Sequence, residues 1–152
     1  MTTITATSTT ARSTTLLWQG AFATGVLAGL APRVNAVIYD HAHIWYLDPE
    51  ARVLLPIVVA LPFVLAGTIG RWAWRGPRNR PAPVGLVLSL ASVAGVVAFF
   101  LSAPIVLGGI AATLGLEGRR RADLGRGRMA TAAVVVGVLA CVGGTALWLA
   151  GI

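Results

Sequence analysis

The chain is poor in charged residues, and nearly all of its charge has one sign. Charged residues make up 11% of its 152 positions and hydrophobic residues 57%, whereas soluble domains carry roughly 25% charged residues. All twelve basic residues are arginine, lysine is absent, and only five residues are acidic. This shortage of charge argues against a soluble domain. Together with apolar runs of about 18 residues or more, it predicts an integral membrane protein.

The motifs that usually support catalysis or metal binding are also missing. The sequence contains no HExxH, no GxSxG, no CxxC and no glycine loop followed by Lys and Ser/Thr. Its one cysteine, Cys141, cannot form an internal disulfide. Acidic residues and histidines fall in predicted loops, and Glu117 opens the last of these. We therefore expect no enzyme, no catalytic or cofactor-binding residues, no cofactor, and no proton- or ion-coupled transporter acting alone.

What the chain does have is an uncharged stretch between Arg80 and Glu117. Its 36 residues would make a straight helix of about 54 Å, but the hydrocarbon core is only about 30 Å thick. Pro104 offers a break, because proline removes a backbone donor and suits the first turn of a new helix. The sequence thus predicts a hairpin of two helices, 83–101 and 104–120. A re-entrant hairpin is the alternative.

The charges on either side of this stretch agree with a hairpin. Arginines 71, 75, 78 and 80 precede it, and arginines 119, 120, 121, 126 and 128 follow it. Short cytoplasmic loops collect arginine and lysine, so both flanks are predicted on the cytoplasmic side. This threading places the N-terminus inside and the C-terminus outside the cell membrane. The residues predicted to contact anionic lipid or a protein partner are Arg119, Arg120, Arg121, Arg126 and Arg128.

The whole chain is then predicted to be an all-α bundle of five transmembrane helices, with four spans as the alternative. Residues 1–15, rich in Thr and Ser, are predicted to be a disordered cytoplasmic tail, and residues 16–152 a single domain. The predicted spans are 16–31, 53–74, 83–101, 104–120 and 129–149. The first could also be a cleaved signal peptide, but Pro32 would directly follow the cut, so an uncleaved anchor is preferred.

The loop between the first two spans contains both histidines. Asp40, His41, His43, Asp48 and Glu50 could form an outer-face metal or haem-related site. However, His41 and His43 would share a face only in an extended strand, and the four convergent ligands of a structural zinc site are not recognisable. A solvated interfacial loop is the preferred interpretation, so no metal site is predicted, and the two histidines are the weak candidates.

Small residues recur at four-residue spacing in the predicted spans. Ala21, Gly25 and Gly29 form one strip, and Ala133, Gly137 and Cys141 another. Such strips let helices approach closely. Packing within the chain is preferred over a dimer motif. Pro62, inside the second span, is expected to kink it.

The second half also resembles a known pattern. The segment Pro104-Ile-Val-Leu-Gly-Gly-Ile-Ala111, followed by Gly125-Arg-Gly-Arg128 and Met129-Ala130, resembles a family of small actinobacterial membrane domains of unknown function. The resemblance is limited to about residues 83–152. It implies the hairpin topology and carries no assigned activity or functional residues.

The predicted function follows from these absences. A net charge of +7 is typical of nucleic-acid-binding proteins. Here the positive charge lies in loops next to predicted spans, so no nucleic-acid partner is expected. The preferred hypothesis is a non-catalytic accessory or structural component that packs against a larger membrane complex or itself. The alternatives are a component of a transporter or channel for a small or apolar solute, and the outer-face role of His41 and His43.

Overall fold

The part of the chain that the structure describes is helical throughout. The computed structural model describes residues 4–38, 49–77, 80–95, 102–121 and 126–150, apart from the side chains at 4–14, 36–37, 49–52 and 54–55. Its elements are α1 (Ile4–Ile38), α3 (Pro49–Leu65), the π-helical turn η1 (Ala66–Gly70), α4 (Arg71–Arg75), α5 (Pro81–Ala94), α6 (Ala103–Arg121) and α7 (Gly127–Leu149). Because α3, η1 and α4 adjoin without a gap, these elements form five helical segments. The prediction of an all-α fold with five helices is confirmed.

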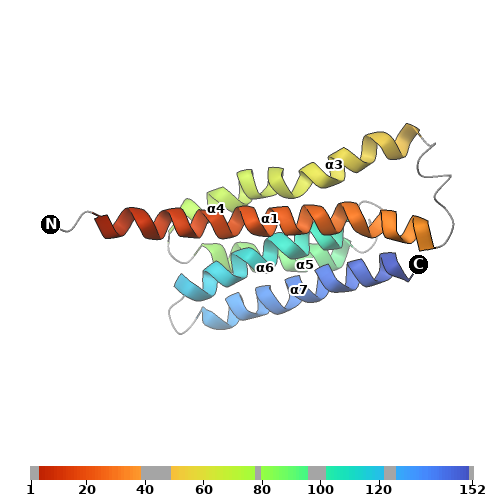
Figure 1. The fold of residues 1–152 in the computed structure, drawn as a ribbon. Coiled ribbons are helices and arrows are strands. Elements are labelled where there is room, and N and C mark those ends of the chain that lie inside the picture. The colour runs from red at the N-terminus through yellow and green to blue at the C-terminus, as the bar shows by residue number, and fades with distance from the viewer. Residues whose placement is uncertain (1–3, 39–48, 78–79, 96–101, 122–125, 151–152) are drawn as a thin grey trace.

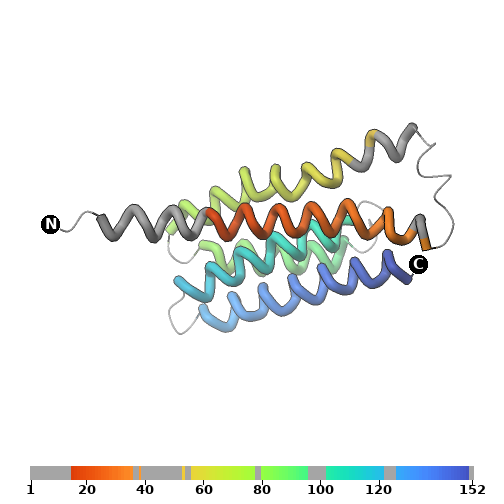
Figure 2. Tube along the Cα trace, viewed as in Figure 1, coloured from red at the N-terminus to blue at the C-terminus, as the bar shows by residue number. Residues whose placement is uncertain are grey.

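Consecutive helical segments run in opposite directions (Figures 1 and 2). The C-terminal ends of α1, α5 and α7 lie at one end of the bundle, and those of α4 and α6 lie at the other. The break predicted near Pro104 is confirmed, because α6 begins at Ala103 and Ser102 has a left-handed φ of 53°. We call the end formed by α4, the start of α5, the last turn of α6 and the first turn of α7 the basic end. Both arginine-rich flanks therefore meet there.

Helix α6 is the centre of the bundle. It packs against α5, α7 and α1, and the side chains of Ile105, Ile110 and Leu114 are fully buried. Helix α3, in contrast, packs mainly against α1 (Figure 1). The bundle thus has a tight group of three helices, α5 to α7, with α1 laid on α6 and α3 laid on α1.

Glycines bring α6 and α7 into backbone contact. A Cβ atom at Gly137 would lie 2.7 Å from the carbonyl oxygen of Gly108, and one at Gly108 would lie 2.6 Å from that of Gly137. Gly115 is equally confined, because a Cβ atom there would lie 2.8 Å from the backbone nitrogen of Val134. The small-residue strip predicted on the last span therefore packs within the chain.

Helices α1 and α6 fit together through two reciprocal glycine–threonine contacts. The space where Gly20 lacks a side chain is filled by Thr113 of α6, and the space at Gly109 of α6 is filled by Thr24 of α1. Both hydroxyls donate to carbonyls of their own helix, Thr24 to Gly20 at 2.7 Å and Thr113 to Ile110 at 2.7 Å. The hydroxyls are thus satisfied within their own helices, and both side chains fill space that the glycines of the partner helix leave open.

Several boundaries differ from those predicted. Helix α1 runs from Ile4 to Ile38, not from 16 to 31, because no Gly or Pro interrupts residues 4–19 and the helix continues through Pro32. Proline in a helix interior removes one hydrogen bond without necessarily ending the helix. Glu117, assigned to a loop from the sequence, lies inside α6 and is 4% exposed.

The second helical segment, α3 to α4, departs from regular α-helical geometry after Pro62. Helix α3 continues past this residue to Leu65, and the π turn follows at Ala66–Gly70. Among the described residues, two helices are long and apolar enough to cross a membrane by length and composition, Pro56–Arg75 and Gly127–Leu149, and Pro81–Ala94 is a shorter apolar helix. Residues 96–101, which belong to the predicted span 83–101, lie outside the described ranges.

The glycine contacts generate a test with an internal control. We expect Gly137→Ala to destabilise the protein by about 1–3 kcal/mol, because the added methyl group would meet backbone atoms that cannot move independently. Gly143→Ala on the same helix meets no atom within 4 Å and should be neutral or stabilising by up to about 1 kcal/mol. Unfolding of both purified variants in mild detergent, followed by circular dichroism, measures the difference. Equal midpoints for the two variants would contradict the backbone contact.

Candidate functional site at the basic end

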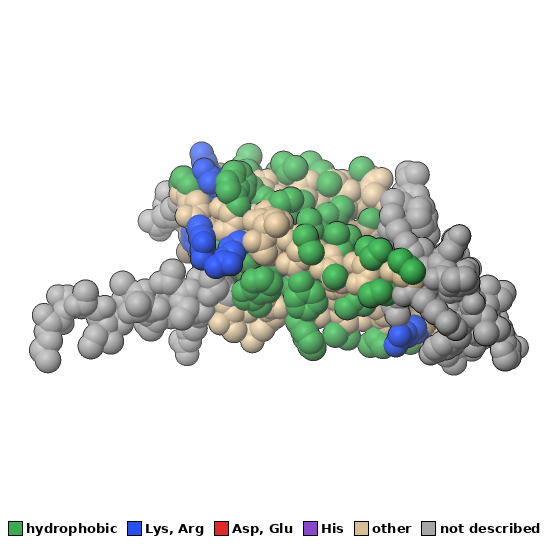
Figure 3. Space-filling model, turned by 90° about the horizontal axis from the view of Figure 1, so that it is seen from above, with side chains coloured by type: hydrophobic (Ala, Val, Ile, Leu, Met, Phe, Trp, Pro, Cys, Tyr) green, Lys and Arg blue, Asp and Glu red, His purple; other side chains and the backbone are tan. Residues whose placement is uncertain are grey.

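The arginines predicted to contact lipid or partners gather at one end of the molecule. Arg119, Arg120, Arg126 and Arg128 are exposed, whereas the side chain of Arg121 is only 22% exposed. Figure 3 shows arginines at the two ends of an apolar face, with most of the basic surface at one end. Four of the five predicted residues are therefore free to contact a charged surface. The fifth, Arg121, is engaged within the bundle.

Arg121 connects α6 to α4. Its Nε donates to Oε1 of Glu117 at 2.6 Å, and its Nη1 donates to the backbone carbonyl of Trp74 at 2.7 Å. The guanidinium also lies 5.6 Å from the centre of the Trp74 ring, within the range of a cation–π contact. Arg120 lies 3.9 Å from Oε2 of Glu117, which accepts no hydrogen bond. The buried carboxylate is thus neutralised by the arginines of its own helix.

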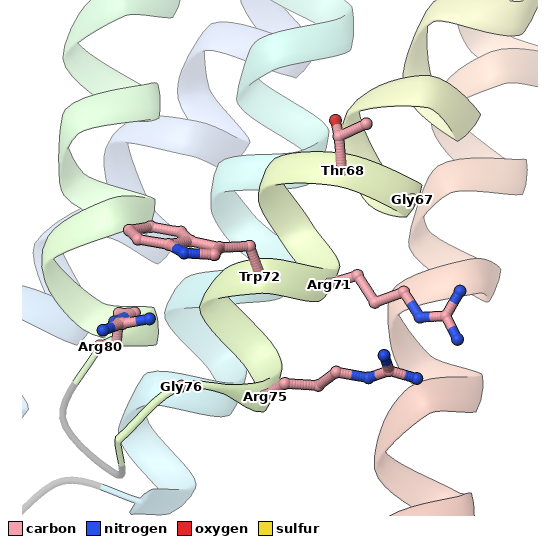
Figure 4. Close-up of a pocket in the computed structure, with 7 residues that line it drawn as sticks. All are labelled: Gly67, Thr68, Arg71, Trp72, Arg75, Gly76 and Arg80. Carbon is pink, nitrogen blue, oxygen red and sulfur yellow. The ribbon is translucent and has the colours of Figure 1, made fainter.

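A second basic group forms a pocket that the sequence alone does not indicate. Its volume is about 500 Å³, and it is lined by Gly67, Thr68, Arg71, Trp72, Arg75, Gly76 and Arg80. Figure 4 shows Arg71 and Arg75 extending side by side from α4, while Arg80 lies beneath the indole of Trp72. The Arg80 guanidinium is 4.4 Å from the centre of that ring. We call this group the cationic pocket.

The opposite end of the bundle is joined by one described polar contact. The side-chain amide of Asn35 on α1 donates to the backbone carbonyl of Trp148 on α7. This contact ties the end of the first predicted span to the end of the last one. Arg33 lies nearby on α1 and is exposed. The loop that holds Asp40, His41 and His43 lies outside the described residues.

The arrangement at the basic end favours binding of anions. Arginine guanidinium groups bind phosphate and carboxylate through paired hydrogen bonds, and indole rings suit the membrane–water boundary. Among the described residues, no group of three or more His, Cys, Asp or Glu side chains could hold a metal ion. The chemistry offered by the described part of this end is therefore ionic contact.

Two signals in the sequence could have indicated these contacts. Glu117 precedes Arg121 by four residues, the spacing of a helical ion pair, and Arg71 precedes Arg75 by the same interval. The approach of Arg121 to Trp74, 47 residues away, has no comparable signal.

The connection between α6 and α4 can be tested by removing its arginine. Arg121→Met leaves the buried Glu117 carboxylate without its closest partner, so we expect a loss of about 1–3 kcal/mol in unfolding free energy. The double variant Arg121→Met/Glu117→Gln should recover part of this loss, because no buried charge remains. Arg119→Met, an exposed arginine on the same turn, should change stability by less than about 0.5 kcal/mol. A double variant less stable than Arg121→Met would contradict the assignment, as would an equal loss in Arg119→Met.

Comparison with known proteins gives no relative. No protein-family model, no curated protein and no solved structure matches this chain.

Proposed function

We propose that the protein is a multi-pass membrane protein, with its basic end at the cytoplasmic surface, that acts as a non-catalytic accessory component of a membrane complex. One observation carries the membrane location: among the described residues, large apolar side chains point outward on every helical segment, and the central α6 contributes Leu116. The most exposed, at 58% to 64%, include Phe22, Val53, Val87, Leu90, Leu139 and Val142. Soluble monomers rarely expose continuous apolar surfaces beyond a few hundred Å².

The distribution of charge supports the orientation. Arginine concentrates at the basic end, where α4 and α6 terminate, and arginine-rich short loops face the cytoplasm in membrane proteins. Helices α1, α5 and α7 end on the opposite side. This orientation puts the N-terminus in the cytoplasm and the C-terminus outside.

The accessory role is supported by the nature of the described surface. Polar groups inside the bundle bind backbone carbonyls of their own helix or of a neighbouring one, as Thr24, Thr113 and Arg121 do. What remains available is an apolar exterior and a set of exposed arginines, both of which are suited to contact with lipid or with another membrane protein.

The membrane location and orientation are tested together. The protein should remain in the membrane pellet after alkaline carbonate extraction, because its apolar surface cannot be solvated by water. A reporter fused to Ile152 that is active only outside the cytoplasm should be active, and one that works only inside should be silent. Release into the carbonate supernatant would contradict the membrane location. An active cytoplasmic reporter would reverse the orientation.

The accessory role is tested by purification of a tagged copy expressed at its native level. We expect a membrane protein partner at a stoichiometric ratio in mass spectrometry after extraction in mild detergent. Recovery as a monomer without a partner would remove the support for an accessory subunit.

A second candidate function, movement of an apolar solute, has one observation in its favour. A groove of about 310 Å³ lies between α1 and α3, lined mainly by apolar residues and by Arg33. Deletion of the gene should then change uptake or leak of apolar compounds. Unchanged uptake and leak would count against this candidate.

A further inference from the structure

The cationic pocket lies on the exposed side of a helical segment whose opposite side is fixed in the core. Thr68, Arg71, Trp72 and Arg75 are exposed on this segment. Arg71 and Arg75 extend side by side, four residues apart, and Trp72 points to the other side of the helix, over Arg80 (Figure 4). Ala66, Gly70, Ala73 and Trp74 of the same segment are buried. Because Trp74 is held in the core and bound by Arg121, the pocket residues cannot turn inward.

Arg80 completes the pocket from the next helix. The chain turns after α4, where the backbone nitrogen of Arg80 donates to the carbonyl of Pro77 at 2.9 Å. The side chain of Arg80 then lies directly against Gly76, so closely that a Cβ at Gly76 would stand 2.5 Å from Cδ and 2.8 Å from Nε. Gly76 has φ −73° and ψ −179°, which any residue can adopt. Glycine at this position therefore leaves room for the Arg80 side chain to lie against the backbone.

Three guanidinium groups line the pocket without a described counter-charge. Glu117 is the one acidic residue whose side chain the structure describes, and it pairs with Arg120 and Arg121. Like charges gathered on one surface raise the local potential and attract an anion. Thr68 does not compete for that anion as a donor, because its hydroxyl donates to the carbonyl of Val64 at 2.6 Å.

We propose that the cationic pocket binds a phosphate group carried by the headgroup of an anionic phospholipid in the leaflet that faces the basic end. Arginine forms paired hydrogen bonds with phosphate oxygens, and Arg71 and Arg75 extend side by side from α4 (Figure 4). Trp72, 57% exposed, belongs at the depth of headgroups and orients Arg80 through its ring. This assignment rests on the proposed membrane location. It differs from the contact predicted at Arg126 and Arg128, which are exposed and line no part of this pocket.

The test compares two pairs of arginines at the same end of the molecule. Full-length protein in detergent is titrated by calorimetry with dioctanoyl phosphatidylglycerol, with dioctanoyl phosphatidylcholine and with sodium phosphate. Arg71→Gln/Arg75→Gln should weaken binding of phosphatidylglycerol by about tenfold or more, because charge-assisted hydrogen bonds are lost. Arg126→Gln/Arg128→Gln removes the same charge from exposed arginines outside the pocket, so only general attraction to the lipid is lost and binding should weaken by no more than about threefold. An equal loss in both pairs would show general attraction to basic surface and would overturn the proposal.

A glycine variant tests the pocket without removing any charge. Gly76→Ala should displace the flexible Arg80 side chain and weaken phosphatidylglycerol binding by about threefold, since one of three guanidinium groups moves away. Gly127→Ala, which meets no atom within 4 Å, is the matched control and should bind as the parent does. Unchanged affinity in Gly76→Ala would overturn the role of Arg80. Circular dichroism of each variant confirms that the fold is retained.

Comparing the three titrated ligands shows which kind of compound carries the phosphate that binds. Strong binding of phosphatidylglycerol with weak binding of phosphatidylcholine supports an anionic lipid. Equal binding of sodium phosphate would overturn the lipid source and identify a soluble phosphate compound as the ligand. Carbonate extraction of the same variants reports on membrane location separately. If carbonate releases the protein, and the protein still binds sodium phosphate through Arg71 and Arg75, the proposed function and the lipid source are both contradicted. The assignment of a phosphate site to this pocket would then still hold.

Discussion

The rest of the structure depends on how closely α6 approaches its neighbours. Gly108 and Gly137 place the backbones of α6 and α7 in direct contact, and the Gly20–Thr113 and Thr24–Gly109 contacts seat α1 on the other side of α6. In a bilayer, the hydrophobic effect does not drive helices together, so van der Waals packing over small residues supplies much of the attraction. At the proposed membrane location, the glycines do more than permit the bundle, because the close contact that they allow is a main source of attraction between the helices. Helix α3, which packs mainly on α1, depends on this arrangement indirectly.

Charge is confined to places where it can be neutralised or hydrated. The described carboxylate, Glu117, is buried one turn from the end of α6 and is paired with arginines from the same helix. The other described arginines lie near the ends of helices, where long side chains can reach water or headgroups. For a protein at the proposed membrane location, this separation of an apolar exterior from charged ends is what would set the orientation.

Much of the fold could be predicted from the sequence because the governing signals are local. The uncharged stretch is too long for one span, and Pro104 marks its break, so the hairpin of α5 and α6 follows from length and backbone chemistry. The gathering of arginines at one end follows from the same hairpin. Helix α1 begins at Ile4, within the Thr- and Ser-rich residues 1–15, where composition alone gives no helix signal and no Gly or Pro interrupts residues 4–19. Glu117 was assigned to a loop since charge usually ends a predicted span, whereas here an ion pair lets the charge stay inside the helix.

The candidate site was harder to predict, because it depends on contacts between distant segments. Arg71 and Arg75 can be placed on one face from their spacing, but the return of Arg80 over Trp72 requires the turn after α4, and the anchoring of Trp74 requires Arg121. Neither contact leaves a pattern in a single sequence.

The π turn at Ala66–Gly70 gives the second segment its alignment with the rest of the bundle. Val58, Pro62, Ala66, Gly70 and Trp74 are all buried and are spaced four residues apart. In a regular α-helix of 3.6 residues per turn, each such step would rotate the buried position by about 40°, so the stripe would wind around the helix. A wider turn takes up the excess residue and returns the stripe to the same side. The irregular turn thus acts as a phase correction. It keeps the same side of the α3–α4 segment facing the core at both ends. At the basic end, Trp74 therefore enters the core while Arg71 and Arg75 face outward.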